Sequence, residues 1–305
     1  MAEKKRIEKQ LQVDARQRLL QQTQAYKQSA LNSISQGIGN DKKEHLVVSL
    51  TSFGPRINDV HLTIESLFQQ SLKADRIVLC LAGSDFSPET LPEMIKSQQR
   101  RGLDVFFCEK DLGPYTKIFY TLKTYPDSLL VTVDDDILYP HDMLDLLYRA
   151  HVKNPAVIPC HRAHKMTFDA SGKLLPYKKW EKSTQDSQPS KLIFPTGVGG
   201  VLYSPGCFSD DVFDKEVFLK LAPNADDVWL KAMSLKEGTL CQRIEDQRIW
   251  GERFPVIAGS QETALKRRNK SPVTGNDSKI QAIFDHYQLW SKLSPDHLGA
   301  ESLQK

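Results

Sequence analysis

The 305-residue chain has no apolar run approaching the roughly 20 residues that a membrane-spanning helix needs. Its first residues carry charges without the apolar segment of a secretory signal. It also lacks an excess of charge, because 41 Lys and Arg residues nearly balance 38 Asp and Glu residues, for a net charge of +3. These absences argue against an integral membrane protein and give no support for nucleic-acid binding. We expect a soluble, cytoplasmic chain that contacts an inner membrane at most peripherally.

The cysteine pattern lacks the features of a metal or redox site. The chain has five cysteines, which lie far apart in the sequence: Cys80, Cys108, Cys160, Cys207 and Cys241. There is no Cys-x-x-Cys pair and no zinc-like spacing, and most of the five lie beside apolar residues. Cysteines of this kind are typically reduced thiols that are partly buried. The pattern therefore suits the cytosol, where disulfides are rare.

Composition divides the chain into three parts. Residues 1–40 are rich in Gln, Lys, Arg and Ala, and they predict an appended helix that ends near residues 37–39. Docking on its own domain, oligomerisation and membrane contact all fit this helix. Residues 45–290 predict one large domain, followed by a C-terminal tail at 291–305. Basic residues at the N-terminus and at 265–270 would suit an anionic substrate or an anionic membrane surface.

From residue 45 onward, short β-branched runs alternate with amphipathic segments. The expected strands cover 45–50, 75–82, 103–109 and 128–133, and the expected helices cover 60–71, 88–102 and 118–126. This alternation predicts a doubly wound, mostly parallel α/β sheet, in which ligands bind at the carboxyl ends of the strands. After residue 140 we expect helices at 141–154 and 225–238, a strand at 156–162 and a polar loop or hairpin at 165–191.

The run "LLVTVDDDILYP" places three consecutive aspartates at the end of the fourth expected strand. Carboxylates this close raise one another's pKa unless a cation neutralises them. Oxygen ligands suit a hard divalent cation such as Mg²⁺ or Mn²⁺. Because side chains alternate along an extended segment, we expect Asp134 and Asp136 to share one site while Asp135 points elsewhere. A helix N-cap with flanking acids is the alternative interpretation.

A strand that ends in three aspartates, after an earlier strand followed by the loop "TSFGPR", resembles glycosyltransferases of the GT-A fold. The aspartates match the D-x-D motif of that fold, and the layout is similar to family 2-like enzymes of bacterial surface-polysaccharide biosynthesis. The resemblance covers residues 46–276. It implies a Rossmann-like GT-A domain that binds Mn²⁺ or Mg²⁺ and moves a sugar from a nucleotide-sugar donor to a hydroxyl of a glycan or lipid-linked acceptor.

The resemblance also implies a set of donor-binding positions. They are Thr51, Ser52, Phe53, Arg56, Asp111, Lys117, Asp134, Asp135, Gly199, Gly200, Lys266 and Arg267. The first three would hold the base and ribose, and Arg56 would reach the base or a phosphate, because its fork suits both partners. Lys117 would contact the nucleotide, with Asp111 on the ribose or base or, alternatively, capping a helix. The glycines would let the backbone approach the donor sugar and acceptor, and the basic loop would hold the pyrophosphate.

In inverting GT-A enzymes, a carboxylate after the glycine segment takes the proton from the acceptor hydroxyl. The resemblance places this catalytic base at Asp226 or Asp227, and we favour Asp227. A helix N-cap accounts for one of these two aspartates and leaves the other to explain. The same resemblance implies metal ligands at Asp134 and Asp136, joined by His286 because the fold often recruits a C-terminal histidine.

Further interpretations stay open at this point. His161 and His164, in "CHRAH", are candidates for contact with the acceptor. A nucleotidyltransferase would also use paired aspartates on a doubly wound sheet, but "TSFGPR" is a poor match to a basic, glycine-rich phosphate loop. A non-catalytic carbohydrate-binding protein could be built on the same fold, although the intact aspartate run argues against it.

Overall fold

A computed structural model of the chain describes residues 2–39, 41–257 and 275–293. Its centre is a seven-stranded sheet with the strand order β3-β2-β1-β4-β8-β5-β9. The strands are β1 (Leu46–Thr51), β2 (Arg76–Ala82), β3 (Leu103–Cys108), β4 (Leu129–Thr132), β5 (Val157–Cys160), β8 (Val201–Tyr203) and β9 (Leu240–Arg243). The predicted α/β class, a mostly parallel sheet with an N-terminal helical extension, is confirmed.

Strand β1 lies between its parallel neighbours β2 and β4, in register Val47↔Arg76 and Val47↔Leu130. These strands are almost entirely buried, as their unbroken runs of Val, Ile and Leu require when helices cover both faces. Strand β8 runs antiparallel to both β4 and β5. The connection from β5 to β8, residues 161–200, contains no α-helix, which is possible because an antiparallel neighbour requires no crossover helix.

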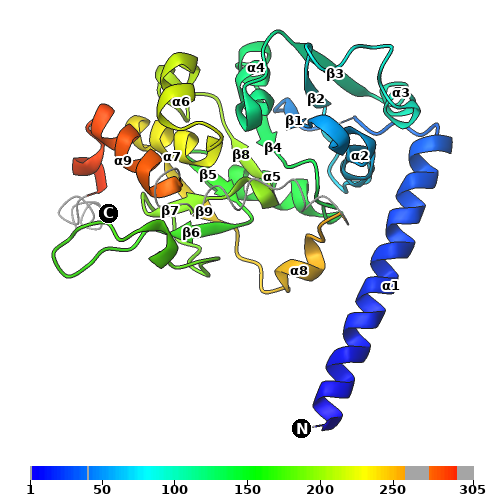
Figure 1. The fold of residues 1–305 in the computed structure, drawn as a ribbon, viewed down its shortest axis with the longest axis horizontal. Helices are drawn as coiled ribbons and strands as arrows, with labels where there is room; N and C mark the ends of the chain where they lie inside the picture. Colours follow the sequence, from blue (N-terminus) through cyan, green and yellow to red (C-terminus); the bar gives the residue numbers. More distant parts are fainter. Residues whose placement is uncertain (1, 40, 258–274, 294–305) are drawn as a thin grey trace.

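Helices cover the two faces of the sheet (Figure 1). They are α2 (Val60–Phe68), α3 (Glu93–Gln99), α4 (Thr116–Thr124), α5 (Met143–Lys153), α6 (Lys215–Leu221), α7 (Asp226–Glu237), α8 (Trp250–Arg253) and α9 (Asn276–His286). Alternate strand residues contribute to two core clusters, Val47 to one and Leu46 and Val48 to the other. This alternation follows from the strand geometry, which points successive side chains to opposite faces.

A separate two-stranded ribbon lies beside the main sheet. Strand β6 (Ala163–Lys165) pairs antiparallel with β7 (Ile193–Pro195), in register Ala163↔Pro195. The polar segment between these strands contains the 3-10 turn η3 (Tyr177–Lys179). A further 3-10 turn, η4 (Gly197–Gly199), connects β7 to β8, so the predicted glycine segment links the ribbon to the main sheet.

The N-terminal helix α1 (Ala2–Asn32) projects from the body of the molecule along most of its length (Figure 1). Only its C-terminal part packs closely, with Tyr26 and Ala30 buried. The helix ends at Asn32, before the predicted end at residues 37–39. The Ser33 hydroxyl there accepts a hydrogen bond from the Ser35 N–H at 3.2 Å, an alternative to continuing the helix.

All five cysteines are free and buried, as reduced structural thiols should be. Across the described residues, no helix combines the length and apolar character that crossing a membrane would require.

Candidate active site

The three aspartates begin two residues after the end of β4, at the carboxyl end of the parallel strands. Tyr139, which is buried, fixes the start of this turn. Its hydroxyl accepts a hydrogen bond from the Asp134 N–H at 2.8 Å and donates one to the Val198 carbonyl at 3.3 Å. The aspartate turn and the glycine turn η4 are therefore tied together through one phenol. Sequence reasoning missed Tyr139, although its position in "DDDILYP" could have indicated it.

Two side-chain cations neutralise the aspartate run. The Arg56 guanidinium pairs with Asp135 Oδ1 at 3.0 Å and forms a second, closer ion pair with Asp136. The Lys117 ammonium pairs with Asp134 Oδ1 at 2.9 Å. The charge cluster that seemed costly in the sequence is thus compensated from the first and third predicted loops. Arg56 and Lys117 are brought to the site as predicted positions, but their charged groups bind carboxylates of the chain itself.

Asp135 is the most deeply held of the three aspartates. Its Oδ2 accepts a hydrogen bond from the Ser52 hydroxyl at 2.7 Å, and Arg56 occupies its other oxygen. Burial raises the pKa of Asp135 to about 6, against the lowering effects of Arg56 and Ser52. These contacts join the loop after β1 to the loop after β4. Asp135 therefore holds these two loops together.

The second carboxylate pair comes from the start of α7. Asp227 Oδ1 accepts a hydrogen bond from the Gly197 N–H at 3.0 Å, and Asp226 pairs with the Lys117 ammonium at 3.4 Å. A β-carbon added at Gly197 would lie 3.3 Å from Asp227 Oδ1 and 3.6 Å from both Asp134 Oδ1 and Lys117 Nζ. Gly197 therefore lies where the aspartate run, Lys117 and the α7 carboxylates converge.

This convergence shifts the acid–base properties of the groups involved. Burial, together with the charge of Asp226, raises the pKa of Asp227 to about 8. Burial alone would lower the pKa of Lys117, but the carboxylates of Asp134 and Asp226 outweigh it, and the net pKa is raised. The site thus combines a permanently charged ammonium with a carboxyl group whose pKa lies near neutral pH, which is the range expected for a general base.

The fit of a divalent cation depends on which carboxylates have solvent access. The Asp134 side chain is 33% exposed and that of Asp136 is 12% exposed. The described residues contain no group of three or more His, Cys, Asp or Glu side chains that could enclose a metal ion by themselves. Mg²⁺ commonly binds one or two carboxylates and completes its shell with water and substrate phosphates, and Asp134 and Asp136 are carboxylates of the kind that such an ion binds.

Other predicted donor residues lie around the same strand ends. The Thr51 hydroxyl donates to the Cys80 carbonyl at 2.8 Å, and the Phe53 ring is 40% exposed with the Arg56 guanidinium 5.4 Å from its centroid. Asp111 is exposed, and its Oδ1 accepts a hydrogen bond from the Gly113 N–H at 2.7 Å. This contact is a local turn between residues 111 and 113 rather than the helix cap that the sequence left open for Asp111, because the structure places the N-caps of the following helices at Leu112 and Tyr115.

The two later glycines make close contacts that a side chain would block. A β-carbon at Gly199 would lie 2.5 Å from the Trp250 ring, so glycine is required for the close approach of α8. Gly200 has a φ of +90° and faces Met143, which places it in the region that favours glycine. Both glycines thus shape the turn that carries Gly197.

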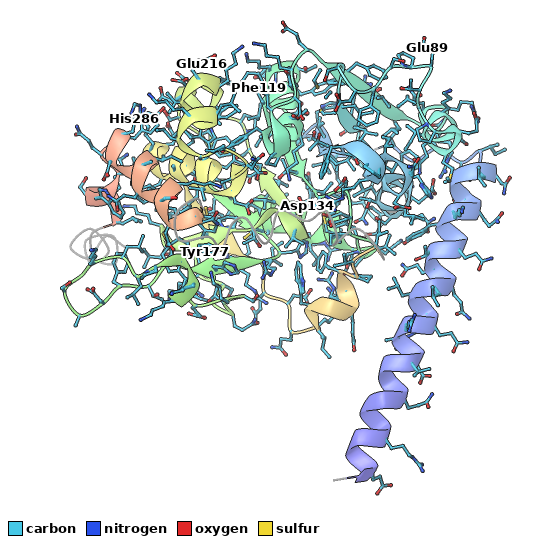
Figure 2. The ribbon with its side chains drawn as sticks, in the orientation of Figure 1. Glu89, Phe119, Asp134, Tyr177, Glu216 and His286 are labelled. Atoms are coloured by element: carbon cyan, nitrogen blue, oxygen red, sulfur yellow. The ribbon has the colours of Figure 1, made fainter. Side chains whose placement is uncertain are left out.

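The structure does not bring all predicted residues together. His286 is exposed near the end of α9, where its ring contacts Tyr287, and Figure 2 shows it well separated from Asp134. Lys266 and Arg267 lie outside the described residues. His161 and His164 are buried: His161 Nε2–H donates to the Met143 carbonyl at 3.0 Å, and His164 Nδ1 accepts from the Ser183 N–H at 3.1 Å.

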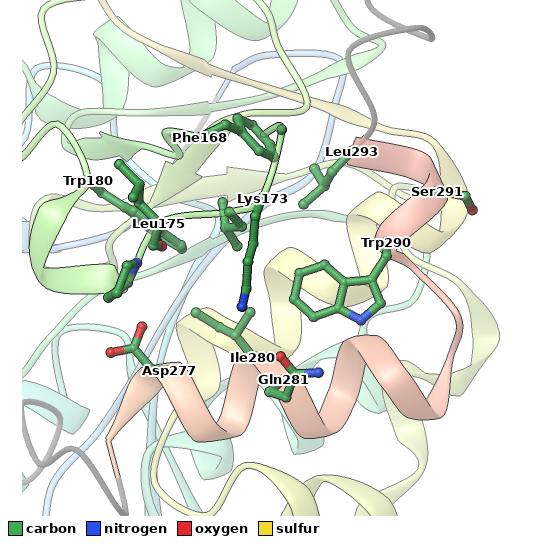
Figure 3. Close-up of a pocket in the computed structure, with 13 residues that line it drawn as sticks. Phe168, Lys173, Leu175, Trp180, Asp277, Ile280, Gln281, Trp290, Ser291 and Leu293 are labelled. Carbon is green, nitrogen blue, oxygen red and sulfur yellow. The ribbon is translucent and has the colours of Figure 1, made fainter. Parts of the chain in front are cut away.

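A cavity of about 720 Å³ lies between the segment after β6 and helix α9. Figure 3 shows the Lys173 side chain reaching from that segment toward α9, with Phe168 and Trp290 on either side. Among its described lining residues, none is a site residue predicted from the sequence. The cavity is therefore distinct from the convergence of carboxylates at Gly197.

Comparison with known families finds one profile that matches just under half of the chain. Residues 56–203 match the glycosyl transferase family 2 profile. No curated protein sequence matches the chain. The segment 56–203 contains the aspartate run, Lys117, Gly197 and strand β8, but ends before Asp226 and Asp227.

Two solved structures show low similarity to this chain. S. aureus TarS 1-349 in complex with UDP is 13% identical with a TM-score of 0.44, and the alignment covers 66% of this chain and 58% of that chain. The mannosyltransferase PcManGT from Pyrobaculum calidifontis, in complex with GDP-Man and Mn²⁺, is 11% identical with a TM-score of 0.44, covering 97% of this chain and 86% of that chain. TM-scores this low add nothing to the family match.

Proposed function

We propose that the chain is a family 2-like glycosyltransferase of the GT-A fold, as the match of residues 56–203 to the family profile supports. The proposed enzyme is metal-dependent and transfers a sugar, with inversion, from a nucleotide-sugar donor to a hydroxyl of a glycan or lipid-linked acceptor. The observation that supports this most directly is the convergence at Gly197. A β-carbon added at Gly197 would lie 3.3–3.6 Å from the charged groups of Asp134, Lys117 and Asp227. Because glycine has no side chain, the space between these groups stays open.

Asp227 is the proposed general base. It takes the proton of the acceptor hydroxyl as the hydroxyl oxygen forms a bond to the anomeric carbon and the bond from that carbon to the diphosphate oxygen breaks. A carboxyl group with a pKa raised to about 8 by burial and by Asp226 is a stronger base than an ordinary aspartate. Asp226 pairs with the Lys117 ammonium at 3.4 Å and helps to hold it in place.

Asp134 and Asp136 would hold a Mg²⁺ or Mn²⁺ ion, with Asp134 the more accessible. When bound, the ion offsets negative charge on the departing nucleoside diphosphate. Ser52 and Arg56 hold the Asp135 carboxylate, and these two contacts fix the turn that carries Asp134. Lys117 supplies a fixed positive charge between the two carboxylate pairs.

The same proposal extends to the organisation of the chain. Residues 45–290 would form the glycosyltransferase domain, with residues 1–40 as a helical extension and 291–305 as a tail. Thr51 and Phe53 would contact the nucleoside, and Gly199 and Gly200 would border the donor sugar. The five free, buried cysteines support a cytoplasmic location.

Binding and turnover with a panel of nucleotide sugars test this function. We expect one class among UDP-, GDP- and CMP-sugars, with Mn²⁺ present, to raise the thermal unfolding midpoint and to be hydrolysed slowly. Asp134→Asn should weaken this donor binding by about tenfold or more. Asp104→Asn is the matched control, because Asp104, on β3, forms a partly exposed ion pair with Arg76, on β2.

Two outcomes would contradict the proposal. The first is the absence of stabilisation by every nucleotide sugar. The second is release of pyrophosphate from a nucleoside triphosphate and a sugar phosphate, which would assign the site to nucleotidyl transfer instead.

A further inference from the structure

Arg162 lies beside the proposed site, although neither the sequence motifs nor the mechanism above use it. It directly precedes β6 and faces Thr196, which directly follows β7. The Thr196 N–H donates to the Arg162 carbonyl at 3.0 Å, and Arg162 Nη1 donates to the Thr196 hydroxyl at 3.1 Å. Because Thr196 is followed at once by Gly197, the ribbon places this guanidinium next to the turn where the carboxylates converge.

The charge of Arg162 is not matched by an acid. Within the described part of the chain, no carboxylate lies within ion-pair distance of it, whereas Lys117 and Arg56 each contact two carboxylates. The guanidinium is half-buried, with the Trp250 ring centroid 5.9 Å away. Burial lowers the pKa of Arg162, and Tyr177 and the charge of Asp227 only partly offset this effect. A half-buried guanidinium that lacks an ion-pair partner among the described residues can bind an anion that arrives from outside.

A second cation lies on the same side of Asp227. The Lys182 ammonium is 3.3 Å from the centroid of the Tyr177 ring, and Tyr177 is 5.6 Å from the His164 ring. His164 cannot supply a negative or positive charge here. Burial, followed by the charges of Lys182 and Arg162, lowers the pKa of His164 to about 3. Arg162 and Lys182 thus both bring positive charge near His164, and the rings of Tyr177 and Trp180 lie beside the Lys182 ammonium.

We propose that Arg162, assisted by Lys182, forms an anion subsite on the β6/β7 side of Asp227 that binds a carboxylate or phosphate group carried by the acceptor sugar. The inference rests on the proposed function, in which Asp227 deprotonates the acceptor. Asp134 and Lys117 approach Gly197 from β4 and α4, whereas Arg162 approaches from the ribbon. An acceptor bound against Asp227 from the ribbon side would place its own anionic group within reach of the guanidinium.

The subsite is tested by binding of small anionic sugars to the full chain. Glucuronate supplies the carboxylate, glucose 6-phosphate supplies the phosphate, and glucose is the neutral reference, all at constant ionic strength. We expect at least one anionic sugar to bind about tenfold or more tightly than glucose, and Arg162→Gln to remove this difference. Added salt should weaken the binding, because the attraction is electrostatic.

The control variant is Arg149→Gln, which removes an exposed arginine paired with Asp145 on α5. Lys182→Gln is a second variant, expected to reduce the preference for the anionic sugar, and it keeps the test decisive if Arg162→Gln does not fold. UDP and GDP binding should be the same in all of these variants. A subsite of the acceptor would leave nucleotide binding intact.

Three results would overturn the inference. Neither anionic sugar binds better than glucose, or Arg162→Gln leaves the preference unchanged, or Arg162→Gln weakens nucleotide binding instead, which would place Arg162 on the donor. Failure of the proposed function itself is distinguishable, because it would appear as loss of nucleotide-sugar binding in the unaltered chain.

Discussion

Asp226 and Asp227 are adjacent in the chain but have different partners. Asp226 pairs with the Lys117 ammonium at 3.4 Å, and Asp227 accepts a hydrogen bond from the Gly197 N–H at 3.0 Å. We expect Asp227→Asn to lower kcat by about 10²- to 10⁴-fold, because the amide keeps the hydrogen bond but cannot accept the acceptor's proton. Donor affinity should be unchanged. Steady-state transfer assays and nucleotide titrations measure the two quantities separately.

Asp104→Asn serves as the control for the aspartate-to-asparagine change, since it should alter neither quantity. If Asp227→Asn retains kcat while Asp226→Asn loses it, the base is Asp226 and the assignment made here is wrong.

His161 makes folding stability depend on pH. Its ring is buried, and burial is the main reason that its pKa is lowered to about 4. Arg253 lowers the pKa further, whereas the hydrogen bond to the Met143 carbonyl and the charges of Asp246 and Asp142 raise it by less than burial lowers it. The unfolded chain regains a pKa near the ordinary 6.5, so it binds a proton between pH 6.5 and pH 4 that the folded chain does not. The stability from this group is complete above pH 6.5 and falls by up to about 3 kcal/mol as the pH drops toward 4.

Urea unfolding of the wild type and of His161→Gln at several pH values checks this effect. The glutamine can still donate to the Met143 carbonyl, so the wild type should lose more stability than the variant between pH 6.5 and 4. Equal pH dependence in the two proteins would show that another group is responsible.

The sequence was enough to predict which charged residues belong to the site, but not which residues pair with them. The aspartate run was visible because three like charges after a buried strand are costly, and its place at the end of β4 is confirmed. Its neutralisation by Arg56 and Lys117 depends on loops far apart in the chain. Arg162 gave no signal, because an arginine at the end of a predicted strand is ordinary until the structure shows that no carboxylate lies within ion-pair distance of it among the described residues.

At the scale of elements, one buried ion pair fastens α1 to the domain. Arg101 Nη1 lies 2.5 Å from Glu65 Oε1, and the same guanidinium donates to the carbonyls of Ser29 at 3.2 Å and Ser35 at 2.8 Å. Glu65 has no solvent exposure. We expect Arg101→Met to lower the free energy of unfolding by about 3–5 kcal/mol, because it leaves a buried carboxylate without its partner. Chemical denaturation measures this loss.

The neighbouring substitution Arg100→Met is the matched control. Arg100 is 65% exposed and pairs with Glu93 at 3.5 Å, so its loss should change the free energy of unfolding by less than about 1 kcal/mol. Similar effects of the two substitutions would contradict the anchoring role of Arg101.

Helices and parallel strands followed from periodicity, but one strand direction did not. The helix predicted at 60–71 is α2, which ends at Phe68, and the one predicted at 225–238 is α7, Asp226–Glu237. Antiparallel β8 lay hidden in the glycine segment, because a three-residue strand shows no period. Strands β6 and β7 flank the polar loop or hairpin predicted at 165–191, and they were not predicted themselves, since their pairing joins residues about 30 apart.

At the scale of the whole molecule, the alternation of strands and helices sufficed to predict the mostly parallel sheet and the end of it where ligands bind. Periodicity also predicted an appended helix, but not how much of it contacts the domain. That depends on a small cluster in which Tyr26 and Leu19 meet Leu62, Leu138 and Ile257. Its members come from four separate segments, so no local pattern could indicate it.

This division of α1 predicts different outcomes for two truncations. Removing residues 1–16 should leave the thermal unfolding midpoint and donor binding unchanged, because the described side chains before Leu19 make no contribution to the core clusters. Removing residues 1–36 should lower the midpoint clearly, since it exposes the surface under Tyr26 and leaves Arg101 without the Ser29 and Ser35 carbonyls. Sedimentation of both proteins shows whether the projecting part joins two copies. A dimer that the shorter truncation converts to a monomer, or a midpoint lowered by that truncation, would show that the projecting half of α1 packs against a partner rather than lying in solvent.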